Sequence, residues 1–478
     1  MFFAELISKD HKDRLPFVRI KKIELTNFKG VEHGVLTLLG DEVVPYNTKS
    51  NILGIYGQNG SGKTAIVEAM GIVKELLGGF ALSSKVTRYI DVNAEWASIA
   101  VEFEFQYKDG TIASVEYSFK LSRKMRSLPK AEAGRASKEE KEFAVISDEI
   151  IKTDMYADGT KKRRHSIIDT KDFLLCNDTC AAYYFENRYN NVKDELTYLK
   201  RKSADDTRSF ILSPDLAELI HTEGINSKYT EILSELNVFA WQYLNVLSTR
   251  SNAIAQLRHG IPIFIPYIKG AVFLNDGTPI PSELAELLET EIRYVQNVIS
   301  TIIPDLHLAL EKSPTKTEDG EDAFYFMLYS LRGDKKIPFD YESDGIIKVV
   351  SILACYIFAF NQGSTTLIVD ELDAGVFEYL LGELLQIFDS DGKGQLIFTS
   401  HNLRPLEVLD KKSICFTSSD PSNRYCRLKN IGSTNNLRDQ YLKAVQLGNT
   451  DVELYKKTKA FKIVKALKQA GKEHGLYE

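Results

Sequence analysis

One glycine-rich segment restricts the fold of this chain more than any other feature. It matches the pattern Gly-x-x-x-x-Gly-Lys-Thr at every fixed position and consists of Gly57, Gln58, Asn59, Gly60, Ser61, Gly62, Lys63 and Thr64. Such a loop surrounds phosphate oxygens with backbone N–H groups at the N-terminus of a helix. An apolar stretch at 51–56 precedes it, and apolar residues at helical spacing follow from Ala65. The sequence therefore predicts a strand, a phosphate-binding loop and a helix in succession.

The last two residues of this loop predict its ligands. The ammonium group of Lys63 would neutralise the β- and γ-phosphates of a nucleotide, and the hydroxyl of Thr64 would ligate Mg²⁺. We therefore expect ATP and Mg²⁺ as cofactors.

A pair of carboxylates forms a second candidate motif. Asp370 and Glu371 follow the apolar stretch 366–369, and ligands of parallel sheets bind at the C-terminal ends of such strands. Asp370 would hold Mg²⁺, and Glu371 would polarise the attacking water as a general base. Most Asp-Glu pairs at strand ends are surface groups, but the complete phosphate loop favours the catalytic interpretation here.

A histidine ends the next apolar stretch. His401 follows residues 395–398 and could hydrogen-bond both the γ-phosphate and the attacking water. A single histidine is more often structural. Its place at the end of a strand beside the carboxylates favours the functional interpretation.

The order of elements predicts an α/β fold. A turn signal at 108–111 between two alternating stretches predicts a β-hairpin, and we expect a mixed N-terminal sheet, a parallel core sheet and a compact helical insertion. The expected parts are an N-terminal lobe at 1–190, a helical insertion at 191–310, a C-terminal lobe at 311–445 and a basic helical tail at 446–478. The tail is expected to dock on its own domain.

Composition limits the cellular setting. The 60 Lys and Arg against 66 Asp and Glu give a net charge of -6, which supplies no overall attraction to nucleic acid, although basic loops leave DNA open. The longest apolar segment, 345–360, contains Lys348 and is shorter than the roughly 20 residues of a membrane span. Together with an odd number of cysteines, this predicts a cytoplasmic protein without a membrane contact.

These motifs resemble those of the ABC-ATPase superfamily, and within it the branch of RecF, SMC and OLD proteins. The similar stretches are 20–30, with its Asn-Phe-Lys ending, 57–64, 370–375 and 399–402. The resemblance covers residues 17–190 and 320–445. It implies an ABC-type ATPase head and places Asp373, in the D-loop, at the nucleotide.

The resemblance also implies that two protomers enclose ATP, with the signature motif of one meeting the γ-phosphate held by the other. The usual motif is Ser-Gly-Gly, whereas this chain has Ser343, Asp344 and Gly345. The additional carboxylate beside a phosphate predicts slow hydrolysis or a long-lived ATP state. Asn187 is the candidate for the family's metal-contacting glutamine, and a plain surface turn is the alternative.

A closer similarity is to short ATPases of bacterial anti-phage and abortive-infection operons, including the PARIS (AriA) and AbiL-type ATPases. It is carried by residues 342–348, 400–403, 427–430 and 435–441. It implies a homo-oligomeric sensor or scaffold that controls a separately encoded effector, such as a TOPRIM nuclease, in response to a phage protein. The alternatives are a RecF-like DNA repair ATPase that closes around DNA, and a scaffold gated by ATP binding. The long insertion disfavours a transporter subunit.

Overall fold

The structure is a computed structural model. It describes residues 15–39, 49–132, 135–157, 160–161, 165–175, 189–222, 228–248, 260–266, 268, 271–427, 437–447, 453–454 and 460–473. Three regions lie outside these ranges: Asn187, some residues of the basic loop at 158–165, and parts of the C-terminal tail. The predicted role of Asn187 therefore stays a prediction.

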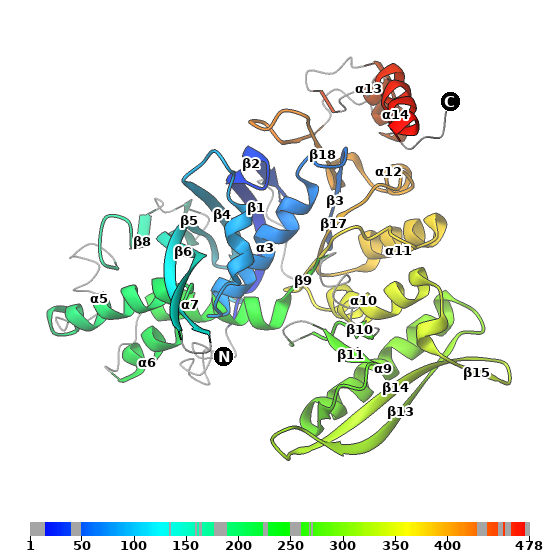
Figure 1. The fold of residues 1–478 in the computed structure, drawn as a ribbon, viewed down its shortest axis with the longest axis horizontal. Coiled ribbons are helices and arrows are strands. Elements are labelled where there is room, and N and C mark those ends of the chain that lie inside the picture. The colour runs from blue at the N-terminus through cyan, green and yellow to red at the C-terminus, as the bar shows by residue number, and fades with distance from the viewer. Residues whose placement is uncertain are drawn as a thin grey trace.

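Seven strands form the N-terminal sheet (Figure 1). They are β1 (Phe17–Phe28), β2 (Val31–Thr37), β4 (Trp96–Gln106), β5 (Ile112–Glu132), β6 (Arg135–Ala157), β7 (Thr160–Lys161) and β8 (His165–Asp169). Their order is β2-β1-β4-β5-β6-β7, with β8 also on β6. The predicted hairpin is confirmed as β4–β5. All these pairs are antiparallel, so the expectation of a mixed sheet needs correction. Short turns such as Lys29-Gly30 permit only antiparallel neighbours.

The core sheet has six strands in the order β19-β18-β3-β17-β16-β9. They are β3 (Asn51–Tyr56), β9 (Leu244–Leu247), β16 (Thr366–Val369), β17 (Gln395–Thr399), β18 (Ile414–Thr417) and β19 (Tyr425–Cys426). Every pair is parallel except β18–β19. The predicted α/β fold with a parallel core is confirmed, and the C-terminal ends of β3, β16 and β17 meet at one edge.

Helix α3 (Lys63–Leu77) lies between the two sheets in Figure 1. Its buried side chains, including Ile66 and Met70, share one hydrophobic core with Ile99 of β4 and Ile368 of β16. The phosphate-binding loop at its N-terminus is thereby fixed to both layers.

The opposite face of the core sheet is covered by α10 (Asp344–Asn361), α11 (Glu378–Asp391) and α12 (Pro405–Val408). Among the described helices, α10 is long and apolar enough to cross a membrane. Only its end residues, Asp344 and Asn361, are exposed, and the helix contacts α9, β10 and β16. It is the buried core helix that its sequence predicts.

Residues 191–310 are divided between both lobes, so the expectation of one helical insertion needs correction. Helices α5 (Tyr189–Asp205), α6 (Pro214–Thr222) and α7 (Lys228–Val238) pack toward the N-terminal sheet. A π-helical turn, Phe239–Tyr243, then leads directly into β9 of the core sheet. A four-residue strand this short carries no periodicity that distinguishes it from a helical segment.

The remainder of this segment belongs to a small antiparallel unit. Strands β12 (Ile280–Pro281), β13 (His307–Lys316), β14 (Asp322–Arg332) and β15 (Lys335–Pro338) form a four-stranded sheet. Helix α9 (Ser282–Ile302) and the pair β10 (Ile261–Ile263) and β11 (Val272–Leu274) share its core. Short 3-10 turns elsewhere cover Ser84–Tyr89, Phe339–Tyr341 and Lys411–Ser413.

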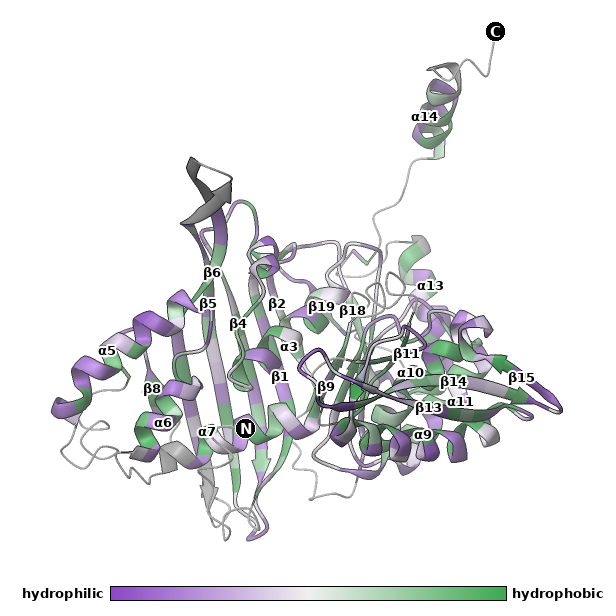
Figure 2. Ribbon diagram, turned by 60° about the horizontal axis from the view of Figure 1, so that its bottom comes forward, coloured by the Kyte–Doolittle hydropathy of each residue, from purple (hydrophilic) through white to green (hydrophobic). Residues whose placement is uncertain are grey.

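Two helices near the C-terminus have different surroundings: α13 (Leu437–Leu447) lies mostly before the predicted tail at 446–478, and α14 (Ala460–Glu473) lies within it. In α13, Leu437 and Ala444 are buried against the core, and Tyr441 stacks on Phe416 at 5.1 Å between ring centroids. In α14, the side chains described, 460–470, are exposed, and the helix lies away from the body in Figure 2. Packing against the core is therefore seen for α13, and the docking expected of the tail is not seen for α14.

Candidate nucleotide-binding site

The phosphate loop joins β3 to the N-terminus of α3, as its sequence predicts. Gly62 is the N-cap residue, with φ of 92°, and no side chain caps the helix; its first turn also contains no acidic residue. The positive φ favours glycine, and a Cβ here would lie 3.0 Å from Cγ2 of Val31. The positive end of the helix dipole is thus left to an anionic ligand rather than to a side chain of the helix.

Lys63 reaches back across the loop. Its Nζ donates hydrogen bonds to the carbonyl oxygens of Gly57 at 2.8 Å and Gln58 at 3.2 Å. Burial lowers the pKa of Lys63, while the negative charges of Asp370 and Glu371 oppose that shift. A buried ammonium group in this position suits a phosphate, which would supply a compensating charge.

Two residues of the C-terminal lobe form hydrogen bonds at the phosphate-binding loop. The hydroxyl of Tyr425 donates to the carbonyl oxygen of Gly62 at 2.8 Å. Thr417 hydrogen-bonds Ser61 and donates to the carbonyl oxygen of Tyr56 at 3.2 Å. A Cβ at Gly57 would overlap Oγ1 of Thr417. The sequence offered no signal for these contacts, because they join segments far apart in the chain.

The two expected metal ligands lie together. The hydroxyl of Thr64 donates to Oδ1 of Asp370 at 3.4 Å, and Asp370 is 1% exposed. No group of three or more His, Cys, Asp or Glu side chains that could hold a metal exists among the described residues. Mg²⁺ keeps several waters and binds through one or two protein oxygens plus phosphates. Thr64 and Asp370 fit that requirement.

Thr399 connects the carboxylate pair to the neighbouring strand, a role that sequence reasoning missed. Its hydroxyl donates to Oδ1 of Asp370 at 2.7 Å and accepts from the backbone N–H of Glu371 at 2.7 Å. Glu371 has φ of 49°, a left-handed conformation that is uncommon for a residue with a Cβ. Thr399 therefore holds the carboxylate of Asp370 and the backbone of Glu371 at once.

Asp373 is placed by the loop after β17. Its Oδ2 accepts from the backbone N–H groups of His401 at 3.0 Å and Asn402 at 2.9 Å. Its Oδ1 is buried and has no hydrogen-bond partner among the described residues. Asp373, expected to contact the nucleotide, thus holds His401 in position within this chain.

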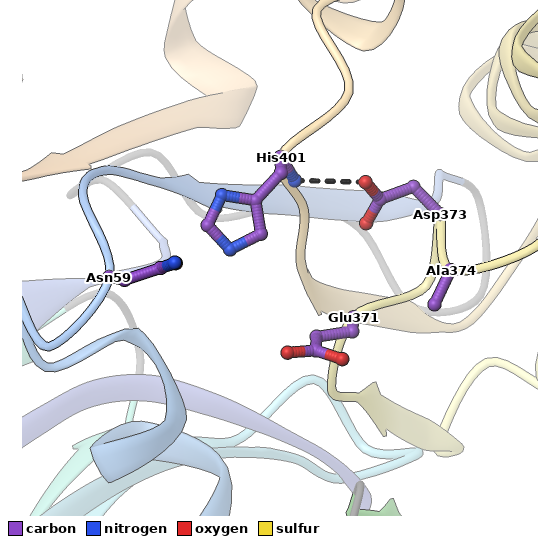
Figure 3. Close-up of a pocket in the computed structure, with 5 residues that line it drawn as sticks. All are labelled: Asn59, Glu371, Asp373, Ala374 and His401. Carbon is purple, nitrogen blue, oxygen red and sulfur yellow. Dashed lines mark hydrogen bonds between the residues drawn. The ribbon is translucent and has the colours of Figure 1, made fainter. Parts of the chain in front are cut away.

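These residues line a cavity of about 260 Å³, formed by Asn59, Glu371, Asp373, Ala374 and His401. In Figure 3 the side chains of Asn59 and His401 point toward each other, and the carboxylate of Glu371 points into the same space. The loop, the carboxylate and the histidine predicted from three separate segments therefore meet in one cavity.

The signature residues lie at the start of α10. Ser343 is exposed and caps the helix, accepting a hydrogen bond from the N–H of Ile346 at 3.4 Å. It does not line the cavity of its own chain. Gly345 is buried, and a Cβ there would overlap the carbonyl oxygen of Gly375. Lys348, one turn further along, donates to the backbone carbonyl of Glu371, another contact that sequence reasoning missed.

A phosphate-binding loop opposite a strand-end Asp-Glu pair, on an α/β fold, defines an ATPase of the P-loop class. The chain belongs to the AAA ATPase domain family AAA_15, whose model matches residues 19–404. Membership implies ATP binding and hydrolysis. No curated protein matches the sequence.

Several solved structures are similar to this chain. An Smc head bound to the C-terminal winged-helix domain of ScpA has 13% identity, with 86% of this chain and 98% of that chain covered and a TM-score of 0.38. An Smc head of Pyrococcus furiosus with an extended coiled coil has 15% identity, coverage of 91% and 100%, and a TM-score of 0.37. The recombination mediator RecF with ATP has 12% identity, coverage of 86% and 100%, and a TM-score of 0.35.

Proposed function

We propose that this chain is an ATPase in which bound ATP governs assembly of protomers, and that it acts as the sensor or scaffold of a bacterial anti-phage system. One observation carries the assembly proposal. Ser343 stands exposed at the N-terminus of α10, beside the 370–375 turn but outside the cavity of its own chain. A second protomer would bring its own Ser343 to complete that cavity.

Different residues of one protomer have different roles at the nucleotide. Lys63 and the N-terminus of α3 would hold the phosphates, and Thr64 with Asp370, which lie together, would hold Mg²⁺. Mg²⁺, when bound, neutralises charge on the phosphates. Glu371 orients and polarises the attacking water, and His401 hydrogen-bonds the γ-phosphate from across the cavity.

Turnover is expected to be slow. Asp344 is exposed in the first turn of α10, directly after Ser343. In the assembled state its carboxylate would lie near the γ-phosphate of the other protomer, and like charges repel. Slow hydrolysis would give long-lived ATP-bound assemblies. Such assemblies suit a sensor that stays assembled until it is triggered.

The link to defence rests on the resemblance of residues 342–348 and 400–403 to ATPases of anti-phage operons. Under this proposal, the assembled ATPase holds a separately encoded toxic effector, such as a TOPRIM nuclease. A phage-encoded trigger protein then releases that effector in the cytoplasm.

The proposal is tested with Glu371→Gln and Ser343→Arg in the full-length chain. Glu371→Gln should abolish hydrolysis, retain ATP-dependent growth in mass and still co-purify the effector encoded by the neighbouring gene. Ser343→Arg should bind ATP but remain monomeric, because a bulky cation blocks the contact. Ser84→Arg, at an exposed serine far from α10, is the matched control and should assemble normally. A mass that is independent of ATP in the wild type would refute the proposal.

A RecF-like DNA clamp is the second candidate, and the exposed basic helix α14 favours it. Lys462, Lys465 and Lys468 are all exposed. This function predicts duplex binding that ATP strengthens and that weakens steeply with salt. Binding measured at several salt concentrations, with and without ATP, distinguishes the two candidates.

A further inference from the structure

Lys348 occupies an unusual position for a lysine on a core helix. It lies in the second turn of α10, is half-buried, and its Nζ donates a hydrogen bond to the backbone carbonyl oxygen of Glu371. Burial lowers the pKa of Lys348, and the charges of Asp373 and Glu371 oppose that shift. The cation is therefore directed at the turn that carries the proposed general base, and not toward solvent.

The backbone of Glu371 is held from two different elements. Thr399 of β17 accepts the N–H of Glu371, and Lys348 of α10 donates to its carbonyl oxygen. Between these two contacts the residue adopts φ of 49°, a conformation that persists only when its surroundings impose it. The direction of the Glu371 carboxylate therefore depends on where α10 lies relative to β17.

A second contact ties the start of α10 to the same turn. Gly345 packs against Gly375 so closely that a Cβ would overlap the carbonyl oxygen of Gly375. Gly375 has φ of 77°, so the 370–375 turn itself is shaped to receive the helix. Ser343, two residues before Gly345, caps this end of α10.

We infer that Lys348 is a positioning residue that transmits the engagement of Ser343 by another protomer's nucleotide to Glu371 of its own chain. Contact between Ser343 and the nucleotide would shift the first turn of α10. Because Lys348 lies in the next turn, its hydrogen bond to Glu371 would shift with the helix. ATP bound at one site would thus prepare the general base at the other site. The inference rests on the proposed function, because it requires protomers to share their nucleotides.

The plain alternative is that Lys348 only balances the charge of Asp370, Glu371 and Asp373. A counterion of this kind would affect stability and ATP affinity. A positioning role instead predicts that the loss falls on kcat and on cooperativity between sites, and that it depends on Ser343.

The experiment compares Lys348→Met, Lys348→Arg, Ser343→Ala and the double variant Ser343→Ala/Lys348→Met in the full-length protein. Methionine keeps most of the aliphatic stem but removes the donor. Lys335→Met, at an exposed lysine on β15, is the matched control. Hydrolysis rates over a range of ATP concentrations give kcat, KM and the Hill coefficient, and light scattering gives ATP-dependent assembly.

We expect Lys348→Met to lower kcat about tenfold and reduce the Hill coefficient toward 1, with KM within about twofold and assembly retained. Lys348→Arg should recover most of the rate. The double variant should resemble the worse single variant, because two steps on one path do not multiply.

Three outcomes would overturn the inference: wild-type kcat and cooperativity in Lys348→Met, multiplicative losses in the double variant, or equal loss of ATP binding in both Lys348 variants. Failure of the proposed function would give different experimental results. It would appear as absent ATP-dependent assembly in the wild type, or as full hydrolysis by Glu371→Gln.

Discussion

The phosphate-binding loop and the 370–375 turn face the same cavity but are held in different ways. The charged group of the loop is held locally: Lys63 donates to carbonyl oxygens of its own loop, and Thr417 and Tyr425 add contacts from the C-terminal lobe. The 370–375 turn has its own hydrogen bond from Ala374 to Glu371, but the backbone of Glu371 is also held by side chains of two other elements, Thr399 of β17 and Lys348 of α10. The loop is therefore a preformed binding element, whereas the turn can respond to movement of its neighbours.

This difference separates binding from hydrolysis. Changes inside the loop should act mainly on ATP affinity, and changes to the supports of the turn should act mainly on the rate. Four substitutions, ordered from the largest expected effect to the smallest, test that separation.

Lys63→Met should weaken ATP binding about a hundredfold or more, because it removes the charge-assisted contacts to the phosphates. Isothermal titration calorimetry of the full-length chain measures this. The thermal midpoint without ATP should not fall, because a buried ammonium group is removed. Retention of wild-type affinity would show that the loop is not the binding element.

Thr399→Val should lower kcat by about tenfold to a hundredfold, because it removes the Thr399 donor to the buried carboxylate of Asp370 and the acceptor for the N–H of Glu371. ATP affinity should change far less. Thr399→Ser keeps the hydroxyl and is the control. Equal loss of affinity and rate in the valine variant would contradict the separation.

Gly57→Ala should lower ATP affinity about tenfold, because the added methyl group overlaps Thr417 and overpacking costs about 1–3 kcal/mol. The double variant with Thr417→Ala should recover part of that affinity, since the smaller side chain makes room. A titration with a fluorescent ATP analogue suffices. If the double variant recovers no affinity, the loss in Gly57→Ala comes from backbone strain at position 57 and not from the clash with Thr417.

Tyr425→Phe should have the smallest effect. It removes one hydrogen bond to Gly62 from outside the loop, at a cost of about 1 kcal/mol in unfolding free energy. ATP affinity should fall by less than about threefold. Chemical denaturation and calorimetry measure the two quantities. A loss as large as that of Lys63→Met would mean that the loop depends on the C-terminal lobe as strongly as the turn does.

The same difference explains which parts could be predicted from sequence. The loop is eight contiguous residues, so its pattern predicted both the element, which the structure confirms, and ATP as its ligand, which family membership implies. Mg²⁺ stays a prediction. Asp370, Glu371 and His401 were predicted because they follow apolar strands of one parallel sheet. Glu371 and His401 line one cavity, Asp370 lies at Thr64, and their roles at a nucleotide stay predictions.

Thr399, Thr417, Tyr425 and Lys348 were missed as site residues for a physical reason. A threonine at a strand end or a lysine on an apolar helix carries no local pattern that reveals a partner elsewhere in the chain. Strand β9 was missed similarly, because a four-residue segment directly after a helix, Leu244–Leu247, reads as its continuation. The antiparallel character of the whole first sheet was missed because the partner of a strand depends on contacts between segments far apart in the chain, such as β1 with β4.

The short strand β9 links two distant parts of the molecule. It continues without a loop from the π-helical turn after α7, and its last residue, Leu247, accepts the backbone N–H of Asp370 at 2.9 Å. The helical layer beside the N-terminal sheet is thereby joined to the backbone of Asp370, the predicted Mg²⁺ ligand, through one continuous segment and one hydrogen bond. A displacement of α7 would therefore reach the backbone of Asp370 without passing through a loop.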